Sequence, residues 1–150
     1  MTKQNMLHIA LAIIHQEGKV LLIKRARPDE FIPELTWAFP GGKVRQNENI
    51  HQSLTREVRE EIGIDIEIEK HVGARNYPGK PEVLQEYYLC HPADSEPLIT
   101  SEPEEIAEIR WVPAKEARNY FTSDVSPQVM EILKEIAQEI TPKFKKETIH

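Results

Sequence analysis

The clearest pattern along this 150-residue chain is an apolar residue at every fourth position between residues 50 and 62. This spacing places the apolar side chains on one face of a helix, and they are Ile50, Leu54, Val58 and Ile62. Asn49 suits the N-cap position, and Gln52 follows three residues later, as in a capping box. Gly63 can take the left-handed conformation that often ends a helix. The pattern therefore predicts a helix from Ile50 to Ile62.

Ahead of this helix the apolar residues predict strands. Leu7 to His15 is almost wholly apolar, as expected of a strand that is buried on both faces. Gln16 to Gly18 is typical of a turn, and Lys19 to Lys24 returns as a second strand, so the two strands form a hairpin. After a proline-containing loop, Leu35 to Phe39 is a short third strand.

Two more strands follow the helix. Asp65 to Ala74 alternates polar and apolar residues, and Glu82 to Cys90 is the next run rich in β-forming residues. Asn76 to Pro81 lies between them and is a turn-rich loop. Because side chains alternate along a strand, Tyr87 and Tyr88 are expected to point to opposite faces of the sheet.

The last third of the chain combines a loop, a strand and two helices. His91 to Glu105 is a polar loop of about fifteen residues, a length that often has a function. Glu108 to Val112 is the last strand, and Pro113 starts a short helix. A final amphipathic helix begins at Ser126-Pro127, and Lys143 to His150 is expected to fray. The residues expected to face inward on this helix are Val129, Ile132, Leu133, Ile136 and Ile140.

This order of elements predicts an α/β fold with a mixed sheet and helices on both faces. The length suits a single domain over residues 1–150. A net charge of −6 disfavours non-specific binding of nucleic acid, and no stretch is long enough to span a membrane. The single cysteine, Cys90, excludes an intrachain disulfide, is expected in the core and fits a cytoplasmic protein.

Three glutamates lie close together on the predicted helix, because Glu60 and Glu61 follow Glu57 by three and four residues. Like charges at this spacing destabilise a bare helix by about 0.2–0.5 kcal/mol per pair. Arg56 and Arg59 offset part of this repulsion. A divalent cation offsets more, because Mg²⁺ and Mn²⁺ prefer clustered carboxylate oxygens. The alternative is a solvated acidic face, which is the commoner role of such a run.

The residues around these glutamates match a longer signature. A loop with two adjacent glycines, Phe39 to Lys43, precedes the helix, and glutamates, an arginine, aliphatic residues and a further glycine follow at fixed spacing. The string resembles the Nudix box of the Nudix hydrolases, with no departure at its nine specified positions. These are Gly42, Glu48, Arg56, Glu57, Val58, Glu60, Glu61, Gly63 and Ile64. The resemblance implies an α/β/α sandwich with a mixed sheet, and metal-dependent hydrolysis of a nucleoside diphosphate linked to another group.

The resemblance also implies roles for single residues. Arg56 orients Glu57 through a salt bridge. The general base that activates water is either Glu57 or a glutamate of the later loop, for which Glu105 is the candidate. The ligands of Mg²⁺, or of Mn²⁺ in its place, are Glu57, Glu60, Glu61 and the carbonyl of Gly41.

Three further residues are candidates for substrate binding. Arg25, at the end of the hairpin, either contacts phosphates or is a surface charge with a packed stem. Lys43, after the two glycines, either meets substrate oxygens or is solvated. Asp124 lies where relatives place a residue that reads a purine edge. One of the two adjacent tyrosines is a candidate to line a nucleobase pocket.

The short chain and its lead-in to the box are similar to the MutT-like branch of the family. That branch implies a small-molecule substrate, a (deoxy)nucleoside triphosphate cleaved to monophosphate and pyrophosphate, and a monomer or homodimer. ADP-ribose or another nucleotide sugar is the main alternative substrate, and dinucleoside polyphosphates are the third. A non-catalytic nucleotide-binding module and a carboxylate-bearing metal sensor also stay open.

Overall fold

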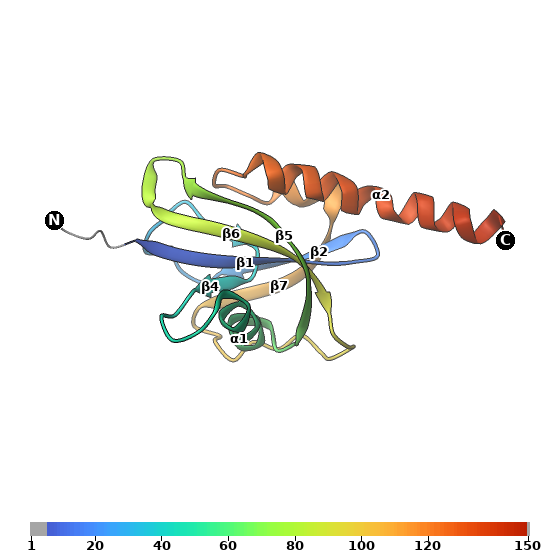
Figure 1. Ribbon diagram of the computed structural model, residues 1–150. Helices are drawn as coiled ribbons and strands as arrows, with labels where there is room; N and C mark the ends of the chain where they lie inside the picture. Colours follow the sequence, from blue (N-terminus) through green and yellow to red (C-terminus); the bar gives the residue numbers. More distant parts are fainter. Residues whose placement is uncertain (1–5, 150) are drawn as a thin grey trace.

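The structure, a computed structural model, describes the backbone of residues 6–149 and the side chains of residues 6–139. Seven strands form a mixed sheet that lies between helices, which confirms the predicted α/β architecture (Figure 1). In chain order the elements are β1 (Leu7–Gln16), β2 (Lys19–Arg25), β3 (Trp37–Ala38), β4 (Gly41–Lys43), α1 (Ile50–Ile62), β5 (Ile66–Tyr77), β6 (Lys80–Pro92), β7 (Ile106–Pro113), the 3₁₀ helix η1 (Ala114–Asn119) and α2 (Pro127–Ile149).

The predicted hairpin of β1 and β2 is present, but its strands soon separate. They pair only at the closed end, where His15 lies opposite Val20 and Gln16 opposite Lys19. Beyond that point β1 pairs with β6 in parallel and with β4 in the antiparallel direction. β2 pairs instead with β3 and β7, both antiparallel. Residues on the diverging parts of β1 and β2 line the cavity described below.

The prediction of a loop at the two glycines is partly wrong, because residues 41–43 form the short strand β4. Ala10 lies opposite Gly42 and Leu11 opposite Gly41 across the β1–β4 ladder. Gly41 has a φ of +148°, and a Cβ on it would stand 2.1 Å from the carbonyl oxygen of Ala10. A three-residue strand that contains two glycines carries no hydrophobic period, so the sequence pattern could not reveal it.

Helix α1 begins and ends as predicted. The Oδ1 of Asn49 accepts the Gln52 N–H at 2.8 Å, the Gln52 side chain accepts the Asn49 N–H at 3.0 Å, and Gly63 has a φ of 81°. The apolar stripe of α1 is buried on one face of the sheet, and η1 and α2 cover the other face (Figure 1). The buried residues that α2 contributes are Val129, Ile132, Leu133 and Ile136.

The remaining boundaries differ by a few residues. β5 continues to Tyr77 and β6 starts at Lys80, so the expected loop narrows to a two-residue turn. β6 also runs on to Pro92 and shortens the long polar loop. Tyr88 packs on the α1 side and Tyr87 on the α2 side, as expected. α2 is helical to Ile149, where the sequence predicted a frayed end from Lys143 onward. The prediction for the side chain of Ile140 falls outside the residues whose side chains are described.

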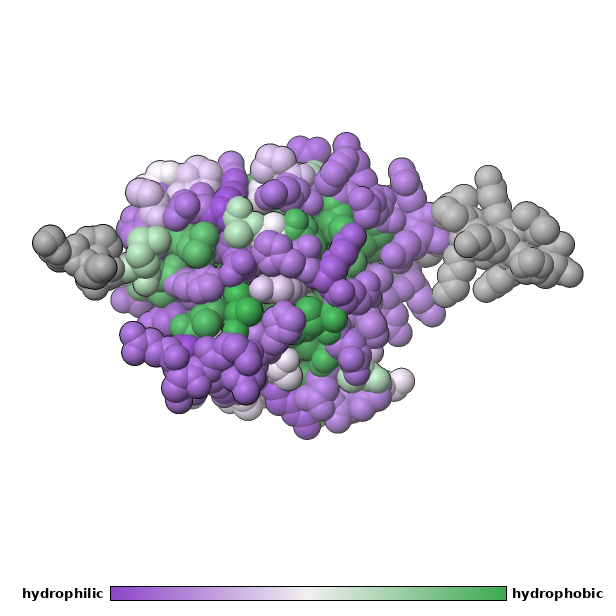
Figure 2. All heavy atoms as spheres, in the orientation of Figure 1, coloured by the Kyte–Doolittle hydropathy of each residue, from purple (hydrophilic) through white to green (hydrophobic). Residues whose placement is uncertain are grey.

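Cys90 is a free, fully buried cysteine, which confirms its place in the core. The face of the molecule in Figure 2 is mostly hydrophilic, and its hydrophobic atoms are seen mainly in the middle, over the sheet between α1 and α2. Among the helices that the structure describes, none is both long and apolar enough to cross a membrane.

Candidate active site

The acidic side of α1 packs against the backbone of β4. Glu61 is only 7% exposed, and its Oε1 accepts the N–H of Gly41 at 2.8 Å. A Cβ on Gly42 would stand 2.6 Å from the carboxyl carbon of Glu57. Gly42 therefore lets the strand approach the carboxylate of Glu57 closely, whereas the missing side chain of Gly41 lets β4 lie close to the backbone of β1.

Arg56 ties these carboxylates to the residues before the helix. Its Nε lies 3.0 Å from Glu48 Oε2. Its Nη1 lies 3.2 Å from Glu57 Oε2 and 3.3 Å from Glu60 Oε1, so the predicted salt bridge between Arg56 and Glu57 is present. Glu48 also accepts the hydroxyl of Ser53 at 2.8 Å. The hydrogen bonds from Arg56 and Ser53 lower the pKa of Glu48, which keeps the Glu48 carboxylate ionised.

Burial and nearby negative charge raise the pKa values of the two inner glutamates. Burial is the main cause of the raised pKa of Glu57, which Arg56 opposes and Glu60 and Glu102 reinforce. The pKa of Glu61 lies well above its usual value because of burial, although the N–H of Gly41 acts in the opposite direction. Two desolvated carboxylates in a negative surrounding are stabilised in their ionised form by a cation.

The chemistry of these donors fits a hard divalent cation. Glu57 and Glu61 offer carboxylate oxygens beside the backbone of Gly41, whereas the Glu60 side chain is 39% exposed and bonds to Arg56. Within residues 6–139, no three His, Cys, Asp or Glu side chains are arranged as a ready metal site. A cation bound here would therefore also need backbone, water or ligand oxygens, which hard divalent cations commonly use.

Glu102 is a glutamate of the later loop whose charge acts on the glutamates of the helix. Its charge contributes to the raised pKa values of Glu57 and Glu61, and partial burial raises its own pKa. Glu105, which the sequence favoured, pairs with Arg27 at 3.1 Å, and both side chains are about half exposed. The role predicted for Glu105 stays a prediction, but the structure places Glu102 nearer to the charge of the helical glutamates.

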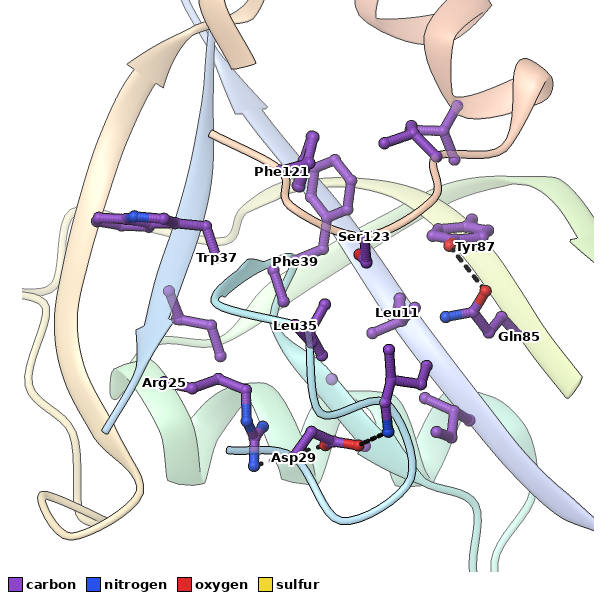
Figure 3. A pocket seen from close by; sticks show the side chains of 18 of the residues that line it. Leu11, Arg25, Asp29, Leu35, Trp37, Phe39, Gln85, Tyr87, Phe121 and Ser123 are labelled. Atoms are coloured by element: carbon purple, nitrogen blue, oxygen red, sulfur yellow. Dashed lines mark hydrogen bonds and ion pairs between the residues drawn. The ribbon is translucent and has the colours of Figure 1, made fainter. Parts of the chain in front are cut away.

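A cavity of about 130 Å³ extends from this acidic cluster to a group of aromatic side chains. Figure 3 shows Arg25 and Asp29 at one end and Phe39, Phe121, Ser123 and Tyr87 towards the other. The rings of Phe39 and Phe121 are 5.3 Å apart between centroids, and those of Phe39 and Tyr87 are 6.4 Å apart. Gly41, Gly42 and Glu61 also line the cavity, so one ligand can reach both the aromatic end and the carboxylates.

The three predicted substrate-binding residues lie in different surroundings. Arg25 lines the cavity, its Nη2 is 3.5 Å from Asp29, and its buried Nε has no hydrogen-bond partner in the described part of the chain. Such unused donors suit an anionic ligand. Asp124 also lines the cavity, and its Oδ2 is held at 2.7 Å by Arg75 Nη1. Lys43 is exposed at the end of β4 and is not among the described residues that line the cavity.

Sequence reasoning missed three polar residues of the cavity, Asp29, Gln85 and Ser123. Gln85 shares one face of β6 with Tyr87, so the two-residue period of the strand could have pointed to it. Ser123 lies in the loop between η1 and α2, where no period constrains the direction of a side chain.

Comparisons with known proteins agree on one family. Residues 5–132 match the NUDIX domain. The CTP pyrophosphohydrolase of Escherichia coli strain K12 is 31% identical over 117 residues, which are 73% of this chain and 85% of that protein. The nucleoside triphosphatase NudI of Klebsiella pneumoniae strain 342 is 32% identical over 122 residues, 75% of this chain and 85% of that protein.

Comparison with solved structures points to the same family. The crystal structure of a MutT NUDIX hydrolase from Burkholderia pseudomallei superposes with a TM-score of 0.65 at 26% sequence identity, and the match covers 88% of this chain and 98% of that one.

Proposed function

The chain belongs to the NUDIX family, and on this basis we propose that it hydrolyses a (deoxy)nucleoside triphosphate to a monophosphate and pyrophosphate. We also propose that residues 1–150 form a single domain. One observation carries the proposal. A single cavity joins an aromatic end to a charged end that contains Arg25 and Glu61. A nucleotide needs both, because its base is planar and apolar on its faces and its phosphates are anionic.

Members of the family generally use divalent metal ions, and we propose Mg²⁺ here, with Mn²⁺ as a substitute. The residues that would hold the ion are Glu57, Glu61 and the carbonyl of Gly41, with Glu60 at the outer edge. When bound, the ion would neutralise phosphate charge and make water a stronger acid.

The side chains around the ion site have separate tasks. Arg25 binds the phosphates through its guanidinium group, whose Nε has no partner among the described residues. Glu57 is the first candidate to accept the proton of the attacking water, because its carboxylate lies within the acidic cluster beside Gly42. Arg56 keeps the Glu57 carboxylate in position, and Glu48 in turn holds Arg56. Glu105 and Glu102 of the later loop are the other candidates for the base.

Identification of the products tests the proposal. The purified protein is incubated with Mg²⁺ and a panel of nucleoside triphosphates, ADP-ribose and dinucleoside polyphosphates. The expected products are nucleoside monophosphate and pyrophosphate, and EDTA is expected to stop their release. Release of AMP and ribose 5-phosphate from ADP-ribose alone would favour the nucleotide-sugar alternative. Binding of nucleotides without any hydrolysis would favour the non-catalytic module.

Gly42→Ala is expected to damage activity more than stability. The three atoms nearest to the new Cβ all belong to the end of the Glu57 side chain, which can swing away, so we expect the fold to survive. The displaced carboxylate then loses its alignment, and we expect kcat to fall by about 100-fold. Steady-state kinetics and thermal unfolding of the same preparation check both parts. An active variant, or one that fails to fold, would contradict this account of Gly42.

A further inference from the structure

One wall of the cavity is the loop of residues 120–126, which connects η1 to α2 without regular structure of its own. Phe121, Ser123 and Asp124 of this loop line the cavity. Figure 3 shows Phe121 close to Phe39, and the centroids of the two rings are 5.3 Å apart. An irregular segment has no ladder or helical hydrogen bonds to fix it, so contacts with other elements decide where this wall stands.

Strand β5 holds the loop through Asp124. The Nη1 of Arg75 lies 2.7 Å from Asp124 Oδ2, and its Nη2 donates to the carbonyl of Asp124 at 3.2 Å. The N–H of Asp124 donates to the hydroxyl of Tyr77, two residues further along β5, at 3.1 Å. Asp124 is therefore bound at its N–H, its carbonyl and its carboxylate by two side chains of one strand.

Arg75 and Tyr77 are themselves fixed in place. Tyr77 is 6% exposed, and its hydroxyl donates to Glu34 Oε2 at 3.0 Å while it accepts from Asp124. The Arg75 side chain is 18% exposed, and its guanidinium lies 5.8 Å from the centroid of the Tyr77 ring. Among the described residues, Asp124 is the only carboxylate that pairs with Arg75. Water screens such a pair less than one between fully exposed side chains, so the contact can hold the loop.

We propose that Arg75 is a positioning residue for nucleotide binding, and that it acts through Asp124 to hold the loop of residues 120–126 as a wall of the cavity. The inference rests on the proposed function, since it takes the cavity to hold the nucleotide. Without Arg75 the wall would stand in place for only part of the time, and the apparent affinity falls with that fraction. Arg75 does not line the cavity, and the proposed chemistry lies at the end that contains Arg25 and Glu61, so turnover of bound substrate is kept.

Steady-state kinetics of Arg75→Met tests this role. The change keeps an unbranched apolar stem but removes the donors to Asp124, and it is expected to raise KM for the best triphosphate about 10-fold and to change kcat by less than about twofold. The hydroxyl of Thr122 still donates to the carbonyl of Glu34, so the loop is loosened and the fold survives.

Two conservative variants grade the effect. Arg75→Lys keeps the charge but loses the two-pronged geometry, and it is expected to restore part of the lost affinity. Tyr77→Phe keeps the ring and removes only the acceptor for the Asp124 N–H, so it is expected to raise KM less than Arg75→Met does. An unchanged KM in Arg75→Met, or a fall in kcat as large as the rise in KM, would overturn the inference.

A double-mutant cycle tests whether Arg75 acts through Asp124. Arg75→Met and Asp124→Ala remove the same ion pair, so the rise in KM of the double variant is expected to be well below the product of the two single effects. Single effects that multiply in full would show that the two residues act independently, which contradicts the proposal. Arg118→Met is the control, because Arg118 is an exposed arginine of η1 outside the cavity lining, and it is expected to change neither kcat nor KM.

A binding measurement keeps the two proposals separate. Calorimetric titration with a panel of nucleoside monophosphates requires no hydrolysis, and Arg75→Met is expected to weaken the tightest of these complexes about 10-fold. Weaker binding by this variant would support the inference even in a protein that cleaves no triphosphate. Hydrolysis by the unaltered protein, together with unchanged affinity in Arg75→Met, would overturn the inference and leave the proposed function standing.

Discussion

Glu61→Gln is expected to lower kcat by about two orders of magnitude or more, although the fold survives. Glutamine has the same shape as glutamate and still accepts the N–H of Gly41, so the contact between α1 and β4 is kept. The negative charge is lost, however, and with it the strongest contribution that this position can make to binding a divalent cation. Steady-state kinetics with saturating Mg²⁺ measures the loss.

The same variant is expected to be more stable than the unaltered protein at neutral pH when metal is removed. Burial raises the pKa of Glu61 above 4.5, so the folded state binds more protons than the unfolded state between these two pKa values. The stability from this group is fully present below about pH 4.5 and is lost as pH rises through the folded pKa. Glutamine does not ionise and therefore avoids this loss.

Urea unfolding with EDTA, from about pH 4 to about pH 8, measures this difference. The unaltered protein is expected to lose more stability over this range than Glu61→Gln does. Glu104→Gln is the matched control, because Glu104 is an exposed glutamate of the later loop. It is expected to keep both kcat and the pH profile of stability. Full activity of Glu61→Gln would show that the buried charge has no part in the reaction.

Gly41→Ala is expected to destabilise the protein by about 3 kcal/mol or more. At a φ of +148° an L-residue is strained, and the new Cβ would stand 2.1 Å from the carbonyl oxygen of Ala10 and 2.9 Å from the Cα of Leu11. These are backbone atoms of a central strand and have no rotamer to change. β4 would have to shift away from β1, which also breaks the hydrogen bond between Gly41 and Glu61.

Gly79→Ala is a control that separates the backbone strain of a positive φ from the steric overlap of a new Cβ with neighbouring atoms. Gly79 also has a positive φ, of +84°, but a Cβ there would meet nothing within 4 Å. Only the cost of the left-handed conformation remains, about 1–2 kcal/mol. Urea denaturation of both variants gives the comparison. If Gly41→Ala proves no more destabilising than Gly79→Ala, the close packing of β4 on β1 is not a constraint on the fold.

Helix α1 and its glutamates are the part of the site that local sequence could predict. The apolar period, the capping box at Asn49 and the terminal Gly63 all act within a few residues, so they specify the helix without any distant contact. Once the helix is fixed, the spacing of Glu57 and Glu61 places both carboxylates on one side of it. The salt bridge from Arg56 to Glu57 follows from the same local geometry.

The positions of Glu102 and Glu105 relative to α1 could not be predicted locally. Both lie in an irregular segment, and only the tertiary structure brings the charge of Glu102 to act on Glu57 and Glu61. Hydrogen bonds from the Ser101 backbone and hydroxyl to the carbonyl of Glu60 hold this segment against the end of the helix. Such a long-range contact has no signature in the pattern of neighbouring residues.

By itself, the sequence determined the acidic helix, the alternating strands and the family signature, because each depends on residues only a few positions apart. Tertiary structure alone decided that β1 and β2 separate beyond their turn, that β4 is inserted beside β1, and that Gln85 and Arg25 face one cavity. Those features arise where strands distant in the chain compete for the same backbone partners, and that competition is resolved only when the whole sheet has formed.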